Sequence, residues 1–497
     1  MREAPELPSN GNCIGIYLGT ANTQVARFNE AGEAEITNNQ EGDTRTPSVV
    51  QIDDNGTVIV GTEAKKFVGT GMPDVFAEFK RDMGSEKSWP TGTKTVTPVE
   101  LSALLLKKVV ADYSEQYGAP QSVVITWPAN YRHAQREATK QAAALAGLRS
   151  VNYIEEPTAA ALYYSSHFAL DGKYLIYDFG ASSLEVTLFE AHHNSIQVVY
   201  QDGVQQLGGR DLDFALLKII GDKFRIQTGD DFDAFDCNFS MSEVEWPKRT
   251  LSIKDKTLIR LVSGKHGPIP IDISREEFTA GIWHLVHQAE MACESVLRCG
   301  KDDPREHVRK SDIKGIFLLG GTSRVPAMQA SVERLFGQKP IVKEPEHAIA
   351  LGAAIYAAHC AGLGTLNALQ AGATTEPTVV HLAGHYLGRT CPLAHGSGTY
   401  NDTVISKGTP LPCAAVRKLN TTRAGQRSVS LEVTQSAIEE ANSDFVTTIG
   451  TLTLELPAGL PLGSPVWAVF EYDRDGSCNV HLFSEHTANS LSLRPSR

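Results

Sequence analysis

The sequence lacks the features that mark secreted, zinc-binding and membrane-spanning proteins. Its eight cysteines form no C-x-x-C pair and show no zinc-ligand spacing, which favours reduced thiols in a cytoplasmic protein. No apolar run approaches the roughly 18 residues of a membrane helix, and residues 1–12 carry no apolar core of a secretory signal. Residues 1–12 are expected to form a disordered tail.

Positive charge is also scarce. The chain has 46 lysine and arginine residues against 58 aspartate and glutamate residues, and its net charge of −12 is spread rather than clustered. This balance argues against nucleic acid or an anionic membrane as the main partner. The rest of the composition, with 41% hydrophobic residues in a chain of 497, is that of a globular protein with a sizeable core.

The pattern of the sequence changes once along the chain. Up to Cys360, apolar strands alternate with helical stretches, which predicts an α/β domain over residues 13–360. Residues 361–384 begin rich in Gly, Ala and Thr and are interpreted as a linker. Short strands with frequent turns follow, and they predict a β-sandwich over residues 385–490.

The α/β domain is organised around the stretch Tyr174–Glu190. An apolar strand ends at Asp178, a turn of small residues follows at Gly180–Ser183, and an alternating strand begins at Leu184. Such a turn can be an ordinary hairpin, since Gly and Ser are common turn residues. It can also be a phosphate cradle, in which backbone N–H groups face an anion and Asp178 holds hydrated Mg²⁺.

A second copy of this pattern favours the phosphate cradle. Ile14–Phe28 is again a strand, a small-residue turn at Gly19–Asn22 and a returning strand, about 160 residues earlier. The repeat indicates an internally duplicated fold in which two hairpins close on one triphosphate. The two copies differ at the end of the first strand, where an aspartate could hold hydrated Mg²⁺. The second copy has Asp178 there, whereas the first has Tyr17 two residues before its Gly.

Three other features of the α/β domain allow two interpretations each. Lys80, in a Lys-Arg pair, is either solvated or a point charge that reaches a phosphate. Glu156, at the start of an Ala-rich helix, either complements the helix dipole or is a carboxylate beside a nucleotide. The glycines Gly208 and Gly209 of the run GGRDLD mark either a turn or a close backbone approach to a ligand.

Four polar residues would share one face of a helix: Glu245, Lys248, Arg249 and Ser252. Such a stripe is normally the solvent side of a helix, but it can also line a purine pocket. Pro247 suggests that this helix starts near it. The following stretch Glu276–Val296 is predicted to be one long amphipathic helix.

The strand Ile316–Leu319 runs into the sequence GGTSRVP at Gly320–Pro326. A strand followed by a Gly pair and a helix start suits an anion or nucleotide site. Arg324 could stack its guanidinium on an adenine face.

With these motifs in view, the chain resembles the 70-kDa heat-shock chaperones over roughly Ile14–Asn489. The resemblance implies a nucleotide domain of actin-like, duplicated ribonuclease H-like fold, with a deep ATP cleft, followed by a β-sandwich that grips extended peptides. It places Lys80 at the family's catalytic lysine and Glu156 at the cleft glutamate of the EPTAAA motif. It places Asp178 at the aspartate that holds Mg²⁺ through water.

The same resemblance implies the remaining contacts of ATP. The expected cofactor-binding residues come from both hairpins, the glycine pairs, the polar stripe and one further acid: Thr20, Ala21, Asn22, Gly180, Ala181, Ser182, Ser183, Gly208, Gly209, Glu245, Lys248, Arg249, Ser252, Gly320, Gly321, Arg324 and Glu346. The partners that the family implies are unfolded or extended polypeptides, a J-domain co-chaperone and a nucleotide exchange factor.

The departures from the family pattern are equally specific. Tyr17 replaces an aspartate of the first hairpin. Ala181 and Ser182 replace glycines of the second hairpin, and Glu185 stands where an aspartate usually follows. Because a phenol is neutral near pH 7, Tyr17 removes a full negative charge from the magnesium side. The added Cβ atoms crowd the backbone approach to the γ-phosphate.

Two further departures concern the rest of the chain. The linker Val379–Ala383 lacks the usual acid, and a helical lid and an acidic tail are not found after the β-sandwich. Both the linker acid and the lid serve the coupling between ATP state and peptide grip in the family.

We therefore expect ATP binding with slow or absent hydrolysis, and weak binding of extended peptides. One alternative is an ordinary lidless ATPase chaperone, because Lys80, Glu156 and Asp178 survive. A second is a non-catalytic ATP-binding scaffold that partners a J-domain co-chaperone. A sugar or acetate kinase shares the actin-like fold, but the β-sandwich and the EPTAAA run argue against it.

Overall fold

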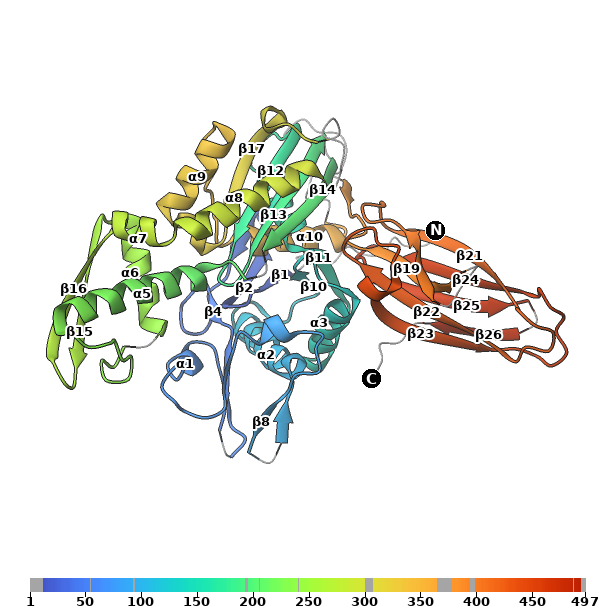
Figure 1. Cartoon of the computed structure of the whole chain (residues 1–497), viewed down its shortest axis with the longest axis horizontal. Coiled ribbons are helices and arrows are strands. Elements are labelled where there is room, and N and C mark those ends of the chain that lie inside the picture. Colours follow the sequence, from blue (N-terminus) through green and yellow to red (C-terminus); the bar gives the residue numbers. More distant parts are fainter. Residues whose placement is uncertain are drawn as a thin grey trace.

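The protein consists of an α/β part and a β part that projects from its side (Figure 1). The computed structural model describes residues 12–53, 55–92, 94–192, 195–204, 206–239, 241–299, 307–363, 378–393, 398–485 and 487–492. The expected tail at residues 1–12, apart from Asn12, lies outside the described residues. So do residues 364–377 of the expected linker.

The first sheet carries the first hairpin. Its strand order is β11-β10-β1-β2-β3, and β4 also pairs with β2. The central strand β1 runs parallel to β10 and antiparallel to β2. The bounds are β1 (Cys13–Leu18), β2 (Asn22–Phe28), β3 (Ala34–Ile36), β4 (Thr46–Pro47), β10 (Ser122–Trp127) and β11 (Val151–Glu155). The part of the molecule built on this sheet is called the first lobe below.

The second sheet repeats this local arrangement around the second hairpin. Its strand order is β17-β12-β13-β14-β18, and β12 runs parallel to β17 and antiparallel to β13. The bounds are β12 (Gly172–Phe179), β13 (Leu184–His192), β14 (Ser195–Val204), β17 (Ile313–Leu319) and β18 (Thr378–Val380). This sheet is the base of the second lobe. The similar strand order agrees with an internal duplication, which stays a prediction.

Two Ala-rich helices hold the lobes together. α10 (Ala348–Cys360) packs on β1, β2 and β10 and on α4 (Glu156–Ser165), which also contacts strands of the second sheet. Small residues make these contacts close: a Cβ on Gly352 would lie 1.7 Å from Ala159 O. Interiors packed this tightly transmit small displacements rather than absorb them. The two hairpins are therefore fixed relative to one another at the adjoining ends of the sheets.

Smaller elements complete the two lobes. The first lobe adds α1 (Thr62–Lys65), β5 (Val49–Ile52), β6 (Val58–Val60), β7 (Val75–Ala77), η1 (Phe79–Asp82), β8 (Trp89–Thr91), β9 (Lys94–Val96), α2 (Pro98–Tyr117) and α3 (His133–Leu145). The second lobe adds α5 (Gly209–Thr228), α6 (Met241–Ile253), β15 (Lys256–Ser263), β16 (Gly267–Ser274), α7 (Arg275–Gly281), α8 (Trp283–Arg298), η3 (Lys310–Asp312), η4 (Gly321–Arg324) and α9 (Pro326–Phe336).

Two helix predictions are wrong. α6 begins at Met241, so Pro247 lies inside the helix rather than near its start. The fully buried Val244 and Leu251 on either side hold the helix in place, and this packing outweighs the hydrogen bond that proline removes. The predicted helix Glu276–Val296 is two helices, α7 and α8, because the chain leaves helical geometry at Ile282, after a glycine.

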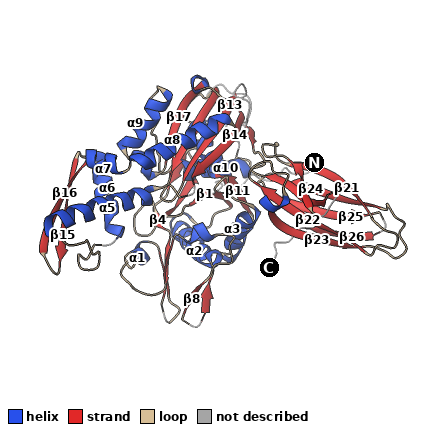
Figure 2. Ribbon diagram, in the orientation of Figure 1, coloured by secondary structure: helices blue, strands red, loops and turns tan. Residues whose placement is uncertain are grey.

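The β part is a pair of sheets that share one hydrophobic core (Figure 2). Their strand orders are β20-β19-β22-β23 and β21-β24-β25-β26. The bounds are β19 (Tyr386–Pro392), β20 (Thr399–Ile405), β21 (Cys413–Asn420), β22 (Ser428–Ser436), η5 (Ser443–Phe445), β23 (Thr447–Glu455), β24 (Pro465–Tyr472), β25 (Cys478–Ser484) and β26 (Thr487–Ser492). Alternating burial along β24 gives the sandwich a core side and a solvent side.

The β part is attached to both lobes. β18 adds a parallel strand to β14 at the edge of the second sheet, and α3 of the first lobe contacts the turn between β24 and β25. The helices of the described residues include none with the length and apolar character needed to cross a membrane.

Candidate functional site

The turn of the second hairpin is the meeting point of separate segments of the chain. Gly180 N donates to Ser183 O at 3.0 Å and closes the turn between β12 and β13. Gly209 N, at the start of α5, donates to Gly180 O at 3.0 Å. A Cβ on Gly208 would lie 2.4 Å from Ala181 O, so this approach of two backbone segments requires glycine.

The Gly320 segment reaches the same turn from β17. Thr322 Oγ1 donates to Gly180 O at 2.8 Å. Gly320 has a φ of 76°, and a Cβ there would lie 2.1 Å from Phe179 O. Three motifs that are far apart in the sequence therefore share one turn, which leaves Ser182 and Ala181 at its tip.

Lys248 joins this turn from α6. Its Nζ donates to Gly209 O at 2.9 Å and pairs with Asp213 Oδ1 at 2.7 Å. Burial raises the pKa of Asp213, although Lys248 opposes the shift. Sequence reasoning missed Asp213, which stands in the GGRDLD run and is the partner that fixes Lys248. Ser252 Oγ is used inside its own helix, where it donates to Lys248 O at 3.1 Å.

Glu346 joins arginines from both lobes. Arg324 Nε pairs with one carboxylate oxygen at 2.8 Å, and Arg45 of the first lobe pairs with the other. Burial alone would raise the pKa of Glu346, but the guanidinium groups of Arg45, Arg324 and Arg249 hold it below its usual range. Arg324 thus faces a carboxylate here, and its stacking on an adenine stays a prediction. Arg45 was not found from the sequence.

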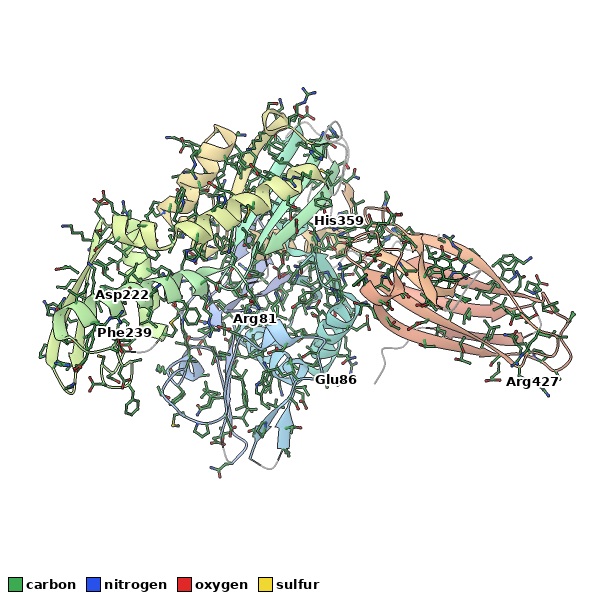
Figure 3. All side chains as sticks on the ribbon, viewed as in Figure 1. Arg81, Glu86, Asp222, Phe239, His359 and Arg427 are labelled. Carbon is green, nitrogen blue, oxygen red and sulfur yellow. The ribbon has the colours of Figure 1, made fainter. Side chains whose placement is uncertain are left out.

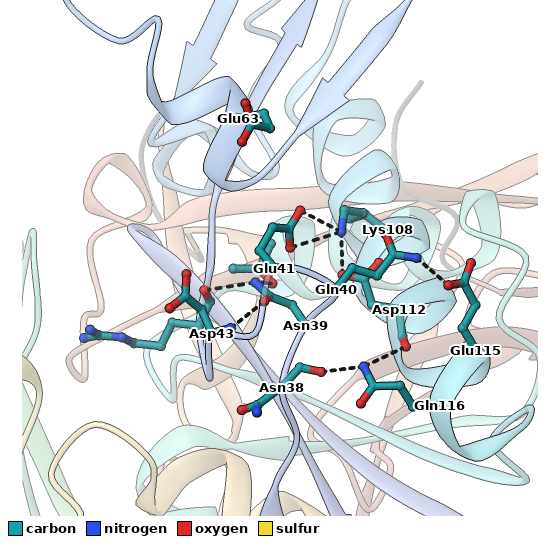
Figure 4. A network of polar contacts seen from close by, with 12 residues as sticks. Asn38, Asn39, Gln40, Glu41, Asp43, Glu63, Lys108, Asp112, Glu115 and Gln116 are labelled. Atoms are coloured by element: carbon teal, nitrogen blue, oxygen red, sulfur yellow. Dashed lines mark hydrogen bonds and ion pairs between the residues drawn. The ribbon is translucent and has the colours of Figure 1, made fainter.

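A polar network in the first lobe holds the loop that carries Arg45 (Figure 4). Gln116 Nε2, on α2, donates to Asn38 O at 2.9 Å, and Lys108 Nζ pairs with Glu41 at 3.3 Å. These contacts tie the loop to a long helix. They hold Arg45 opposite Glu346 of the second lobe. The space between the lobes is called the cleft below, and a pocket in it is lined by Arg81, Ser182, Gln206, Arg210, Asp211 and Phe214.

Two more pairs connect the lobes at the mouth of the cleft. Lys65 Nζ lies 3.7 Å from Glu245, and Glu78 pairs with Arg210. Glu78 also lies 3.5 Å from Arg81, which is seen near the middle of the α/β part in Figure 3. These side chains are one-third to one-half exposed, so each pair is worth about 0–1 kcal/mol. The ion pairs between the lobes at these positions are therefore weak.

Buried charges lie deeper in the cleft. Lys80 Nζ pairs with Glu156 Oε1 at 2.8 Å, and the side chains are only 7% and 8% exposed. Asp178 and Glu185 are paired neighbours across β12 and β13. Burial and the charge of Glu156 raise the pKa of Asp178 to about 7 and that of Glu185 to about 8, although Lys80 opposes both shifts. From the sequence, Glu185 stood out only as a departure from the family pattern.

Tyr17 lies among these carboxylates. Its hydroxyl has a pKa well above the usual value because of burial and of the charges of Glu156, Asp178 and Glu185. The ring lies so close to the hairpin turn that a Cβ on Gly19 would be 2.7 Å from it. Tyr17 is therefore a neutral, bulky group at the end of β1.

The turn of the first hairpin leaves its tip accessible. Thr20 and Asn22 are partly buried and Ala21 is exposed. Ser48 fixes the backbone of this turn, because its N–H donates to Ala21 O at 2.9 Å and its hydroxyl donates to Gly19 O at 2.7 Å. The turn is thus held from behind, and its tip faces the cleft.

Comparison with known proteins identifies the family. The family model described as "Hsp70 protein" matches residues 13–494. The chain is 31% identical over 494 residues to the "Chaperone protein DnaK" of Halobacterium salinarum, a match that covers 97% of this chain and 74% of the relative. It is 32% identical over 483 residues to that of Thermotoga petrophila, which covers 94% of this chain and 77% of the relative. The chain belongs to the Hsp70 family.

This membership confirms the resemblance that the sequence motifs indicated. The charged groups of this Hsp70 are unbalanced: one ammonium group, that of Lys80, faces three carboxylates, those of Glu156, Asp178 and Glu185. Burial and the neighbouring carboxylates raise the pKa of Asp178 and of Glu185, so the site carries a surplus of negative charge when all three carboxylates are ionised. A cation accompanying a nucleotide would relieve this surplus.

The site fits a cation that the protein holds indirectly. In the part of the chain that the structure describes, no group of three or more His, Cys, Asp and Glu side chains is arranged to ligate a metal ion. Mg²⁺ commonly keeps several waters and is bound through one or two carboxylates and phosphate oxygens. A water-mediated contact to Asp178 therefore agrees with the geometry better than a protein-only metal cage.

Proposed function

We propose that this Hsp70 is a chaperone whose cleft binds ATP with Mg²⁺ and hydrolyses it slowly or not at all. The observation that carries the proposal is Tyr17, a neutral ring packed against the Gly19 turn among three carboxylates. The phosphate-facing turns and the pocket residues around Lys248 and Glu346 support binding. The loss of a charged group at Tyr17 supports impaired hydrolysis.

The residues of the cleft divide between binding and chemistry. Backbone N–H groups at the tips of the two hairpin turns would bind the phosphates. Lys80, held by Glu156, would place its charge against the reacting phosphoryl group, and Asp178 would hold Mg²⁺ through water. Bound Mg²⁺ would supply charge neutralisation at the phosphates. Lys248, fixed by Asp213, would contact the nucleoside.

Tyr17 would weaken the chemical step more than the binding step. Hydrolysis needs charge that is already oriented where it develops, and removal of one such group typically costs about 3–4 kcal/mol, or 10²- to 10³-fold in rate. The nucleoside pocket lies on other elements, in α6 and the Glu346 loop, and does not depend on Tyr17. Binding should therefore survive where turnover does not.

The domain boundaries and partners follow from the same proposal. We place an actin-like, duplicated nucleotide domain at residues 13–360, a linker at 361–384 and a peptide-binding β-sandwich at 385–490. Unfolded or extended polypeptides would dock on the sandwich by strand addition, with a J-domain co-chaperone and a nucleotide exchange factor as further partners. None of the eight cysteines, all of which lie in the described residues, forms a disulfide bond, which supports a reducing compartment such as the cytoplasm.

The test compares the wild-type protein with Tyr17→Asp. Calorimetric titration with Mg-ATP is expected to show binding for both proteins, with little phosphate release by the wild type in a single-turnover assay. Tyr17→Asp is expected to raise the single-turnover rate about 10²- to 10³-fold. Equal rates in the two proteins would refute the role of Tyr17, and absent binding in both would refute the ATP site itself.

A scaffold that partners a J-domain co-chaperone is the second candidate. It is favoured by the linker Val379–Ala383, which lacks the acid of the family pattern and carries the buried His381. Such a scaffold would bind ATP and the co-chaperone without releasing a bound peptide on addition of ATP. Peptide release driven by ATP would instead support an ordinary ATPase chaperone.

A further inference from the structure

Three histidines are buried where the α/β part meets the β-sandwich. His133 begins α3 of the first lobe, His381 follows β18, and His385 precedes β19 of the sandwich. Their exposed fractions are only 6%, 9% and 5%. They are thus contributed by both sides of the junction and by the segment between them.

The contacts of these rings suit their neutral forms. His133 Nδ1 lies 3.3 Å from Cys478 Sγ of β25, and the backbone N–H of His133 donates to Gln435 Oε1 of β22 at 3.2 Å. His381 packs edge-on against the Tyr356 ring, with 6.0 Å between centroids. The Nε2 atoms of His133 and His381 are buried without a hydrogen-bond partner. An imidazolium has two N–H donors, and neither ring has acceptors for both.

A buried arginine adds a positive charge to the same junction. Arg136 is 2% exposed and pairs with Glu155 at 2.8 Å, while its Nη1 donates to Asp475 O in the sandwich at 2.5 Å. Its charge disfavours protonation of all three histidines. The other charged or titratable groups that face them are Arg132, Glu137, Lys140, Tyr356, Lys407, Asp473, Arg474, Asp475 and Cys478.

We propose that His133, His381 and His385 form a pH-sensitive latch, and that protonation of their rings separates the β-sandwich from the first lobe. Charging His133 or His381 would bury an imidazolium near Arg136 without acceptors for both of its protons, and charging His385 would add a buried charge near the same guanidinium. Separation would return each ring to water. The cluster does not bring three metal-ligating groups together within the described residues.

The pKa values of the histidines in the closed state determine whether acid favours the open or the closed state. Burial first, and then the charge of Arg136, lower the pKa of His381 to about 4 and that of His385 to about 3; burial also lowers the pKa of His133. In the open state each ring would return to about 6.5, so the open state binds more protons. Acidification from pH 7.5 to pH 5.5 would then weaken closure about tenfold for His381 and about tenfold for His385, or about a hundredfold together.

One carboxylate of the β24–β25 turn, that of Asp473, titrates in the pH range of this test. Burial and Asp475 raise the pKa of Asp473 to about 7, whereas Lys140 and the turn contacts hold the pKa of Asp475 below its usual range. The raised pKa of Asp473 favours closure in acid, by about 25-fold between pH 7.5 and pH 5.5. Asp475, whose pKa is lowered, stays ionised over this range and contributes little. Asp473 and Asp475 are both present in the histidine variants. A difference in pH dependence between the wild type and these variants therefore measures the contribution of the histidines.

The test measures opening of the full chain without nucleotide, so its outcome is separate from that of the ATP proposal. Small-angle X-ray scattering at pH 7.5 and pH 5.5 gives the open fraction, and melting curves confirm that the domains stay folded. Because the titration of Asp473 opposes that of the histidines, we expect closure of the wild type to weaken by a net factor of about four between pH 7.5 and pH 5.5. Closure of His381→Gln/His385→Gln should instead strengthen about 25-fold over the same interval, a difference of about a hundredfold between the two proteins. The control His287→Gln, whose side chain is 64% exposed on α8, should behave as the wild type.

Two further variants keep the test decisive. His381→Arg carries a permanent charge and is expected to be open at pH 7.5. If the glutamine variant is already open at pH 7.5, His381→Leu/His385→Leu restores apolar packing without a titrating group. Equal pH dependence in the wild type and a closed double variant would overturn the latch, as would a closed His381→Arg protein.

Discussion

Binding of Mg-ATP is expected to release about one proton from the cleft at pH 7.5. In the empty cleft, burial and Glu156 raise the pKa of Asp178 to about 7 and that of Glu185 to about 8. A cation beside these carboxylates favours their charged forms and returns both pKa values toward or below the ordinary value near 4. The protons that the empty cleft holds are then released to the buffer.

The magnitude follows from the two pKa values. At pH 7.5, Asp178 holds about 0.2 proton and Glu185 about 0.8, a total of about 1.0; the total is about 1.9 at pH 6 and about 0.1 at pH 9. The two groups interact, so the assay reports their sum rather than either one. Because the free cleft holds more protons than the loaded one, affinity for Mg-ATP should rise about tenfold per pH unit near 7.5 and level off by pH 9.

Titration calorimetry in buffers of different ionisation enthalpy measures this release directly. The observed binding enthalpy is plotted against the buffer's ionisation enthalpy, and the slope is the number of protons exchanged. Glu185→Gln should lower the release to about 0.2 proton at pH 7.5, whereas the exposed control Glu86→Gln should leave it unchanged. ATP binding with less than about 0.3 proton released by the wild type, or equal release by Glu185→Gln, would refute the reasoning.

Two predictions concern stability. Arg136→Ala leaves the Glu155 carboxylate buried and unpaired, so it should lower the free energy of unfolding by about 3–5 kcal/mol. Urea unfolding measures this loss, and the exposed control Arg149→Ala should stay within about 0.5 kcal/mol; a loss below about 1 kcal/mol would contradict it. Gly320→Ala should lower the free energy of unfolding by at least about 1–2 kcal/mol, because the φ of Gly320 is positive. The clash of the added Cβ with Phe179 O should lower it further. In the control Gly321→Ala, the added Cβ would have no atom within 4 Å, so this variant should melt close to the wild type. Similar melting temperatures for the two variants would show that backbone strain and crowding at Gly320 do not contribute to stability.

The sequence predicted the parts of the site that are local along the chain. The two strand–turn–strand units around Gly19 and Gly180 follow from apolar runs and small residues that are adjacent in sequence, and the structure contains both hairpins. The Gly208–Gly209 pair is predicted from the sequence either to mark a turn or to approach a ligand closely, whereas in the structure Gly208 approaches another backbone segment. That segment is the backbone at Ala181, and its position depends on how α5 packs against the second sheet.

The residues that sequence reasoning missed owe their roles to long-range contacts. Arg45 and Glu346 are 301 positions apart and meet only because the lobes face each other across the cleft. Asp213 resembles any surface acid until α5 and α6 bring it to Lys248. Pro247 shows the opposite error, in which a strong local rule failed because buried neighbours hold the helix on both sides of the proline.

Two consecutive glutamates connect the cleft to the junction. Glu155 ends β11 and pairs with Arg136, whose guanidinium also binds the sandwich at Asp475 O. Glu156 begins α4 and pairs with Lys80 in the cleft. One peptide unit joins the two carboxylates, and β11 and α4 lie in a tightly packed core. We therefore expect a shift of Glu156 on nucleotide binding to displace Glu155, and through Arg136 the contact with Asp475 of the sandwich. Nucleotide binding in the cleft and closure of the sandwich are thus expected to influence each other through Glu155 and Glu156.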